Sequence, residues 1–182
     1  MNWTELEEAV YQAATAVFTN LQAAHPDEQF YAFALYTDGG AMTICPAASS
    51  REALSRKLAK EGIDAADEDV LYYTWSTSEW PYESWQGERF NDICTALRES
   101  LPSEEDHEHF LAQVFQTMTN AMARVRDDGV FTSEKPGNAP VLFVTLTDDE
   151  QAEAVEDASA KALNSPEIYA RFSARYASGS PG

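Results

Sequence analysis

The chain has 182 residues, of which 31 are Asp or Glu and 12 are Lys or Arg, giving a formal net charge of −19 at pH 7. Nucleic-acid and anionic-lipid binding draw their affinity from Lys and Arg, so this balance argues against nucleic acid and membranes as partners. The hydrophobic fraction of 44% is enough for a folded core and argues against disorder.

The length of the chain favours one domain, which we expect over residues 1–177, followed by a flexible tail over 178–182. No apolar run approaches the ~20 residues of a membrane span. The first residues also lack the basic and apolar regions of a signal peptide. The sequence therefore predicts a cytoplasmic protein.

The N-terminal part of the chain predicts a helix followed by a β-hairpin. Apolar side chains recur at helical spacing over residues 3–24. The β-prone runs 30–37 and 41–45 flank an Asp-Gly-Gly turn at 38–40, and Asp-Gly favours the tight turns that join hairpin strands. Because the run 30–37 is apolar on both faces, we expect a central strand covered on both sides.

Later segments predict more helices and two more strands. The expected helices lie at about 50–61, 90–101, 103–126, 148–163 and from 165 onward, and the expected strands at 70–77 and 139–146. These strands are too scattered for a regular βαβ alternation. We therefore expect an α+β fold with a roughly four-stranded mixed or antiparallel sheet, which includes the hairpin and is packed by about six helices.

Motifs that carry chemistry are scarce in this sequence. The adjacent glycines lie in the hairpin turn, not between a strand and a helix, so they form no nucleotide-binding loop. His107 and His109 are two residues apart, which places them on different sides of a helix rather than around one metal. Cys45 and Cys94 fit buried packing positions. The sequence assigns no catalytic residue, no cofactor and no metal, and it favours a non-enzymatic role.

Residues 78–88 form a loop that combines aromatic and acidic side chains. Its aromatic members are Trp80, Tyr82 and Trp85, and its acidic members are Glu79, Glu83 and Glu88. One interpretation is that the tryptophans close the edge of the core while the glutamates are solvated. A second is a protein-binding loop, since Tyr and Trp are the usual anchors of interfaces. A third is a saccharide or catalytic site, which requires two carboxylates converging in a cleft lined by Trp75 or Trp80.

The helix expected at 148–163 carries like charges along one side. Five acids fall within an arc of about 120°, and we call them the acidic ridge. The acidic ridge consists of Asp149, Glu150, Glu153, Glu156 and Asp157. Like charges three and four residues apart each cost a few tenths of a kcal/mol. A ridge that tolerates this repulsion indicates a basic partner.

Two longer stretches of the sequence resemble a known family. They read FYAFALYTDGGAMTICPAASS and, further along, YYTWSTSEWPYE. Together with the helix at 3–24 they are similar to the bacterial family catalogued as domain of unknown function 4303, over nearly the whole chain. The resemblance implies no established activity and no functional residue. Members resemble immunity proteins in being small, cytoplasmic and acidic.

We therefore expect a non-enzymatic acidic binding protein that neutralises a basic partner, such as an antibacterial toxin domain with nuclease activity. The predicted partner-binding residues are the acidic ridge together with Trp80, Tyr82, Glu83 and Trp85. One alternative is an enzyme or saccharide-binding domain that uses the loop 78–88. Another is a housekeeping domain whose acidity serves solubility. The oligomeric state is left open.

Overall fold

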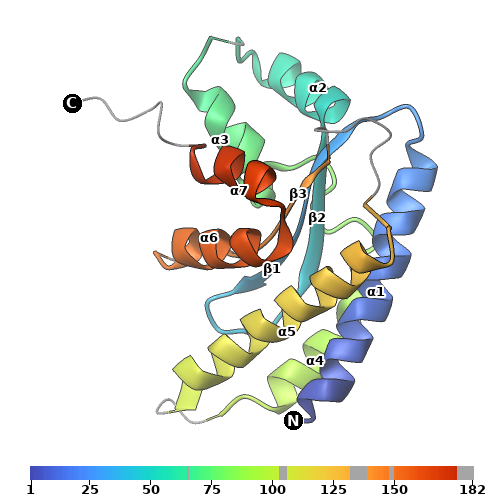
Figure 1. The fold of residues 1–182 in the computed structure, drawn as a ribbon, viewed down its shortest axis with the longest axis vertical. Coiled ribbons are helices and arrows are strands. Elements are labelled where there is room, and N and C mark those ends of the chain that lie inside the picture. The colour runs from blue at the N-terminus through green and yellow to red at the C-terminus, as the bar shows by residue number, and fades with distance from the viewer. Residues whose placement is uncertain (65, 103–105, 132–138, 148–149, 176–182) are drawn as a thin grey trace.

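The computed structural model describes residues 1–64, 66–102, 106–131, 139–147 and 150–175. Within these ranges the chain forms an α+β fold with seven α-helices, two 3-10 helices and a three-stranded mixed sheet (Figure 1). The α-helices are α1 (Trp3–Ala24), α2 (Arg51–Glu61), α3 (Asp69–Trp75), α4 (Asn91–Glu99), α5 (His107–Asp127), α6 (Ala152–Leu163) and α7 (Pro166–Ser173). The strands are β1 (Phe30–Asp38), β2 (Cys45–Ser50) and β3 (Val141–Thr147), and the 3-10 helices are η1 (Thr77–Glu79) and η2 (Gly87–Phe90). In the described ranges, no helix combines the length and the apolar character that crossing a bilayer requires.

The sheet has the order β2-β1-β3, so β1 is the central strand, as the sequence predicts. β1 runs antiparallel to β2, with Tyr36 opposite Cys45, which confirms the hairpin pairing. It runs parallel to β3, with Ala34 opposite Phe143. The sheet is therefore mixed, and it has one strand fewer in the described residues than the sequence led us to expect.

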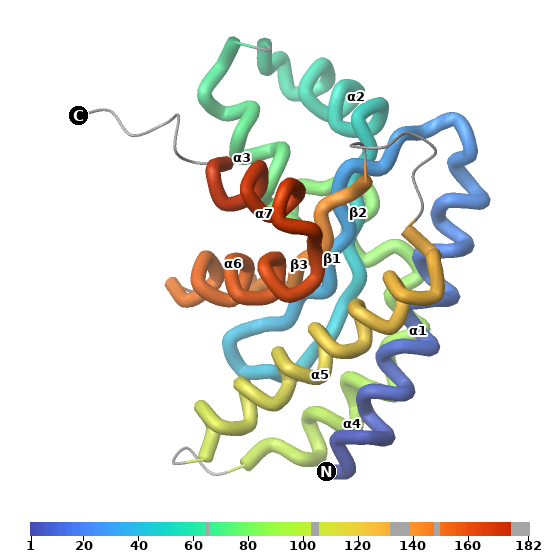
Figure 2. Tube along the Cα trace, viewed as in Figure 1, coloured from blue at the N-terminus to red at the C-terminus, as the bar shows by residue number. Residues whose placement is uncertain are grey.

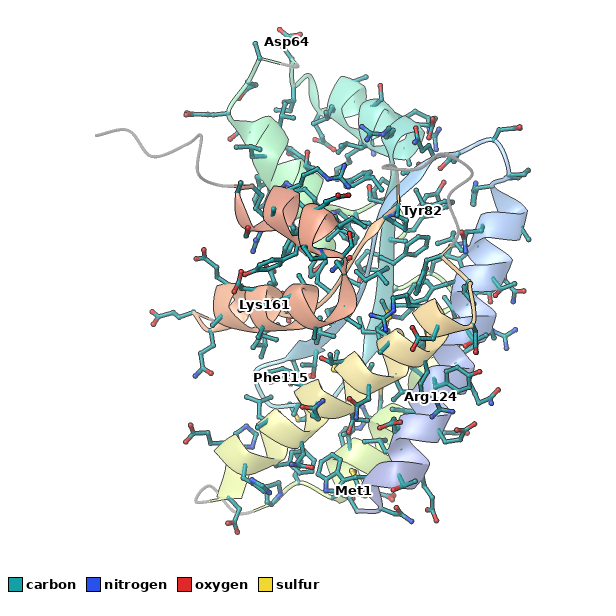
Figure 3. The ribbon with its side chains drawn as sticks, viewed as in Figure 1. Met1, Asp64, Tyr82, Phe115, Arg124 and Lys161 are labelled. Atoms are coloured by element: carbon teal, nitrogen blue, oxygen red, sulfur yellow. The ribbon has the colours of Figure 1, made fainter. Side chains whose placement is uncertain are left out.

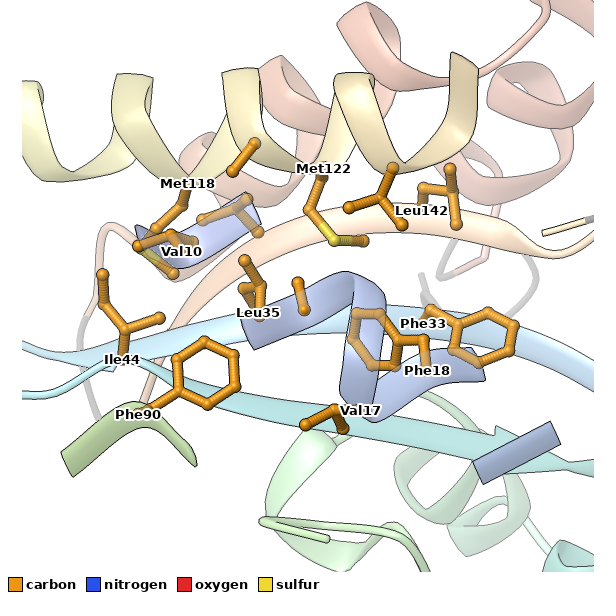
Figure 4. Packing of buried hydrophobic residues seen from close by; sticks show 14 of the residues in the cluster. Val10, Val17, Phe18, Phe33, Leu35, Ile44, Phe90, Met118, Met122 and Leu142 are labelled. Atoms are coloured by element: carbon orange, nitrogen blue, oxygen red, sulfur yellow. The ribbon is translucent and has the colours of Figure 1, made fainter. Parts of the chain in front are cut away.

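Alternating side chains of β1 enter two separate hydrophobic clusters, one on each face of the sheet. Phe33 and Leu35 point into the larger cluster, which α1 and α5 cover. Figure 4 shows part of this packing, in which Phe18 of α1 lies edge-on to Phe33 with ring centroids 5.2 Å apart. Ala32 and Ala34 point into the smaller cluster on the opposite face, toward α7. Figure 2 shows α1 and α5 on one side of the strands and α6 and α7 on the other.

The outer edge of β3 is covered by polar side chains from α6 and the residue that follows it. Asn164 accepts a hydrogen bond from the Leu142 amide at 2.9 Å and donates one to the Leu142 carbonyl at 2.7 Å. Two residues along, the Ser159 hydroxyl accepts from the Val144 amide at 2.9 Å and donates to the Val144 carbonyl at 3.2 Å. These side chains take the place of a fourth strand, because they pair with backbone groups that an exposed edge would leave open.

Removing the amide of Asn164 should destabilise the fold. In Asn164→Ala, both backbone groups of Leu142 lose their partner, and an unpaired buried polar group costs about 1–3 kcal/mol. We expect the free energy of unfolding to fall by about 2 kcal/mol in urea titrations. The control is Asn120→Ala, which removes an exposed hydrogen bond to Glu7 and should change stability by less than about 0.5 kcal/mol. Equal stability losses in the two variants would contradict a role of Asn164 at the edge.

The strand predicted at 70–77 is wrong, because residues 69–75 form α3. The segment is rich in aromatic residues. Such residues favour a strand only in a context where the segment can pair with a neighbouring strand of a sheet. Side chains from α6 occupy the edge of β3, and on the β2 side the Ser84 amide donates to the Pro46 carbonyl at 2.9 Å. The segment instead turns into a helix whose Thr74 hydroxyl donates to the Val70 carbonyl at 2.7 Å.

The strand predicted at 41–45 is also misplaced, because β2 begins at Cys45. The carboxylate of Asp38 accepts hydrogen bonds from the Gly40 amide at 2.9 Å and the Thr43 hydroxyl at 2.6 Å. Ala41 adopts a φ of 53°, a left-handed conformation that does not fit a strand. A loop organised around Asp38 therefore takes the place of the expected tight turn at 38–40.

Candidate functional site

The aromatic side chains of the loop 78–88 lie mainly in the core. Trp80 is 3% exposed and Tyr82 is 8% exposed, and Trp85 is half-buried against the larger cluster. The Trp80 indole donates to the Thr74 carbonyl at 3.0 Å, which joins the loop to α3. The interpretation that these tryptophans close the edge of the core is therefore confirmed. Trp80 and Tyr82 do not offer an exposed anchor to a partner.

Tyr82 belongs to a polar cluster around Glu28, which lies just before β1 (Figure 3 labels Tyr82). The Glu28 carboxylate accepts hydrogen bonds from the Ser50 hydroxyl at 2.5 Å, the Tyr82 hydroxyl at 2.7 Å and the Arg56 guanidinium at 2.6 Å. Burial raises the pKa of Glu28, but these three donors outweigh it and hold the pKa at about 2. Burial and the neighbouring carboxylate raise the pKa of Tyr82 to about 12. Because Glu28 already accepts hydrogen bonds from three side chains, the cluster has a structural role and joins the loop 78–88 and α2 to the start of β1.

A second polar contact involves Glu83, another of the predicted partner-binding residues. Glu83 is exposed, and its carboxylate accepts a hydrogen bond from the Tyr36 hydroxyl of β1. Burial and this hydrogen bond raise the pKa of Tyr36. Burial also raises the pKa of the nearby Cys45 thiol, which keeps it protonated and weakly nucleophilic at neutral pH. Cys45 is half-buried and Cys94 is buried, so both are packing residues as expected.

The acidic ridge is not one continuous exposed surface. Glu156 points toward the sheet, where it accepts from the Thr145 hydroxyl at 2.7 Å and from the Arg175 guanidinium at 2.6 Å. The Glu156 and Arg175 side chains are 14% and 3% exposed. The prediction that Glu156 belongs to an exposed surface is therefore wrong. The missed signal is its spacing, because Ala160 and Leu163, four and seven residues later, are both buried.

The other ridge residues differ in their exposure. Glu150 and Glu153 are exposed, and no described side chain forms a hydrogen bond or an ion pair with either. Asp157 is half-buried and accepts from the Tyr169 hydroxyl at 2.8 Å. Asp149 lies outside the described residues. The exposed part of the ridge in the described chain is thus smaller than the sequence suggests.

A hollow lies between α2, α3 and α7, at the end of the sheet where β1 and β3 begin. Its volume is about 710 Å³, and we call it the α2–α3–α7 pocket. Its principal apolar side chains are Leu54, Leu58, Ile63, Trp75, Val141 and Phe172. α2 buries a single residue, Ala53, and α3 buries none, so their apolar side chains border this pocket instead of a closed core. The elements around it can be followed in the upper half of Figure 1.

Among the described residues, the charged lining of the pocket consists of two arginines and one aspartate. Arg51, at the first position of α2, and Arg171, in the last turn of α7, both line it. Tyr31 also lines it, but its hydroxyl donates to the Thr74 carbonyl at 2.8 Å, and burial raises its pKa, so the phenol stays neutral. Asp64 is the one carboxylate among the described lining residues. The pocket therefore lacks, in the described chain, the paired carboxylates that glycoside hydrolysis uses.

This pocket was not found from the sequence. Leu54 and Leu58 are one turn apart on a helix that is otherwise polar, which is a weak sign of an apolar stripe. Trp75 and Phe172 line it from segments almost one hundred residues apart, and the centroids of their rings lie 5.2 Å apart. Only the tertiary fold brings these side chains together.

Comparison with known protein families identifies the family of this chain. The family model described as domain of unknown function DUF4303 matches residues 10–165, which is most of the sequence. The chain belongs to the DUF4303 family. Within this DUF4303 protein the match covers all three strands and stops before α7, so Arg51 lies inside the matched region and Arg171 beyond it. No curated protein and no solved structure shows significant similarity to it.

Proposed function

We propose that this protein is a non-enzymatic binding protein whose binding site is the α2–α3–α7 pocket. The observation that carries the proposal is a pocket of about 710 Å³ lined largely by half-buried apolar side chains. Small-molecule sites are commonly concave, mostly apolar and about 300–1,000 Å³ in volume. The described lining includes neither His nor Cys, and Asp64 is its one carboxylate, so a binding role fits it better than acid–base or nucleophilic catalysis.

The driving force for such binding is the removal of apolar surface from water. Leu54, Leu58 and Ile63 are each half-buried, so an organic ligand that covers them completes their burial. Full burial of one aliphatic side chain contributes roughly 1.5–3 kcal/mol relative to full exposure, so three half-buried side chains offer a useful share of a small ligand's affinity. A ligand with an apolar body therefore fits the pocket.

A neutral, solvent-sensitive dye such as Nile red tests this proposal. We expect saturable binding to one site, with a fluorescence increase, and a dissociation constant at least fivefold weaker in Leu58→Gln because the substitution places an amide in the apolar lining. The matched control is Leu101→Gln, since Leu101 is 39% exposed and lies outside this pocket. Circular dichroism verifies that both variants are folded. Dye binding that Leu58→Gln leaves unchanged, or that does not saturate, would refute the proposal.

We propose a second function for the acidic surface, which is binding of a basic protein partner, such as a toxin domain. The formal charge of −19 supports it, since complementary charge accelerates association with a basic surface. Glu150 and Glu153 support it as well, because both are exposed, Glu150 in the turn before α6 and Glu153 in its first turn. Asp157 and Glu83 are already hydrogen-bonded within the chain and contribute less free charge.

The second proposal predicts association that is sensitive to salt. In a pull-down from the source cells, we expect a basic protein to be captured at low salt and lost at high salt, because screening shortens the range of charge attraction. The double variant Glu150→Lys with Glu153→Lys should lose this capture. A control with the same charge change, Glu88→Lys with Glu99→Lys, alters exposed acids elsewhere and should retain it. Capture that is indifferent to salt and to both variants would exclude the acidic surface as the binding site.

A further inference from the structure

Two cations that line the α2–α3–α7 pocket have no acidic partner in the described chain. Neither the Arg51 nor the Arg171 guanidinium forms a hydrogen bond or an ion pair with a side chain of the described residues. Most other arginines do form such contacts, and the basic residues held in ion pairs are Arg56, Lys57, Arg124, Arg126 and Arg175. The contrast is notable because acids outnumber bases by 31 to 12 in this sequence.

A guanidinium beside an apolar wall has a specific chemical preference. It carries five N–H donors in a planar fork, and this fork matches the two oxygens of a carboxylate or the oxygens of a phosphate. Hydrogen bonds of this charge-assisted kind are about twice as strong as neutral ones. The net charge of −19 repels anions at long range. Two guanidinium groups at one pocket, by contrast, form a local positive site that attracts an anion.

Asp64, the one carboxylate among the described lining residues, lies away from the start of α2. Arg51 is the first residue of α2, and Asp64 follows the other end of this eleven-residue helix. At ~1.5 Å per residue the helix separates the two positions by roughly 16 Å along its axis. Figure 3 shows Asp64 at the outer tip of the turn that joins α2 to α3. The apolar side chains of Leu54 and Leu58 lie on α2 between Arg51 and Asp64.

We propose that the α2–α3–α7 pocket binds an amphipathic anion, with its apolar body against α2 and Trp75 and its carboxylate or phosphate head at Arg51 and Arg171. The inference rests on the proposed function of this pocket and specifies the class of ligand. The apolar walls select the body, and the two guanidinium groups select the charge of the head. Such a ligand supplies a negative charge that, among the described residues, no side chain provides to these two arginines.

Displacement of bound Nile red by three compounds of equal chain length tests this inference. The compounds are decanoate, decyl phosphate and decanol, used below the concentrations at which they form micelles. We expect at least one of the two anions to displace the dye at a concentration tenfold or more below that of decanol. The two anionic compounds distinguish a carboxylate head from a phosphate head, and a preference for either one supports the proposal.

The variants separate the role of the two arginines from a general effect of charge. Arg51→Gln with Arg171→Gln should bring the anions to within about threefold of decanol while leaving the affinity for the neutral dye within about twofold. The control Arg89→Gln with Arg98→Gln removes two exposed cations outside the pocket and should keep the preference. If Nile red binds but decanol displaces it as well as the anions do, the anion inference fails and the pocket proposal stands. If the preference for the anions over decanol survives in Arg51→Gln with Arg171→Gln, the anion inference is also overturned. If Nile red does not bind at all, the proposal that this pocket is a binding site is refuted.

Discussion

Replacing Glu156 with glutamine is expected to lower the free energy of unfolding by about 3–5 kcal/mol. The substitution leaves the Arg175 guanidinium, whose side chain is 3% exposed, without the carboxylate that contacts it at 2.6 Å. Removing the charge of one member of a buried ion pair is costly because the guanidinium has lost water, and the neutral amide that replaces the carboxylate attracts it less strongly. Equilibrium unfolding in urea, followed by circular dichroism, measures the loss.

Glu153 provides the matched control, because it lies one turn away on the same helix and is exposed. Glu153→Gln should change the stability by less than about 0.5 kcal/mol. A double-mutant cycle with Arg175→Met isolates the pair, and we expect the double variant to recover part of the loss, since it removes both charges. Equal effects of Glu153→Gln and Glu156→Gln would contradict a structural role for Glu156.

The distinction between Glu156 and Glu153 shows what helical spacing can and cannot settle. The spacing placed both acids on one side of the helix, and a surface helix has its acids exposed by default. The partner that turns Glu156 inward is Arg175, nineteen residues later and beyond α7. The guanidinium also stacks on the Phe172 ring, 3.8 Å from its centroid, but this contact is local, between residues three apart. The spacing of residues within α6 holds no record of the contact between Glu156 and Arg175.

Elements with strong local signals are predicted well. α1 begins and ends where its apolar repeat does, because a 22-residue amphipathic helix carries six buried side chains at regular spacing. Its first turn is fixed by Asn2, whose side chain accepts from the Thr4 and Glu5 amides. β1 is recognisable as central because its apolar side chains occupy both faces. In these elements the sequence and the tertiary environment favour the same structure.

Elements without an independent local signal are predicted poorly. β2 consists of small residues and Pro46, which lack the bulk of typical strand residues, and pairing with β1 rather than propensity makes it a strand. α3 fails for the opposite reason, because its aromatic residues suggest a strand, whereas side chains of α6 pair with the edge of β3 and the Ser84 amide pairs with β2. The α2–α3–α7 pocket depends on the second outcome, because Thr74 and Trp75 of α3 line it.

The cluster around Glu28 should make the stability of the fold depend on pH in the acid range. The pKa of Glu28 is about 2 in the folded chain, against an ordinary value of 4.5, because the donors from Ser50, Tyr82 and Arg56 outweigh the effect of burial. A carboxyl group with a lowered folded-state pKa stabilises the fold fully above its unfolded pKa and loses this contribution as the pH falls. The difference of about 2.5 pKa units corresponds to about 3 kcal/mol at neutral pH.

Comparison of the wild type with Glu28→Gln isolates this contribution from that of the other carboxylates. We expect the difference in free energy of unfolding to decrease by about 3 kcal/mol between pH 6 and pH 2, because below its folded pKa the Glu28 carboxyl is neutral in both states. Glu68→Gln, which changes an exposed acid that no described side chain pairs with, should show a nearly constant difference over the same range. A Glu28→Gln difference that does not vary with pH would mean that Ser50, Tyr82 and Arg56 do not stabilise a charged carboxylate at Glu28.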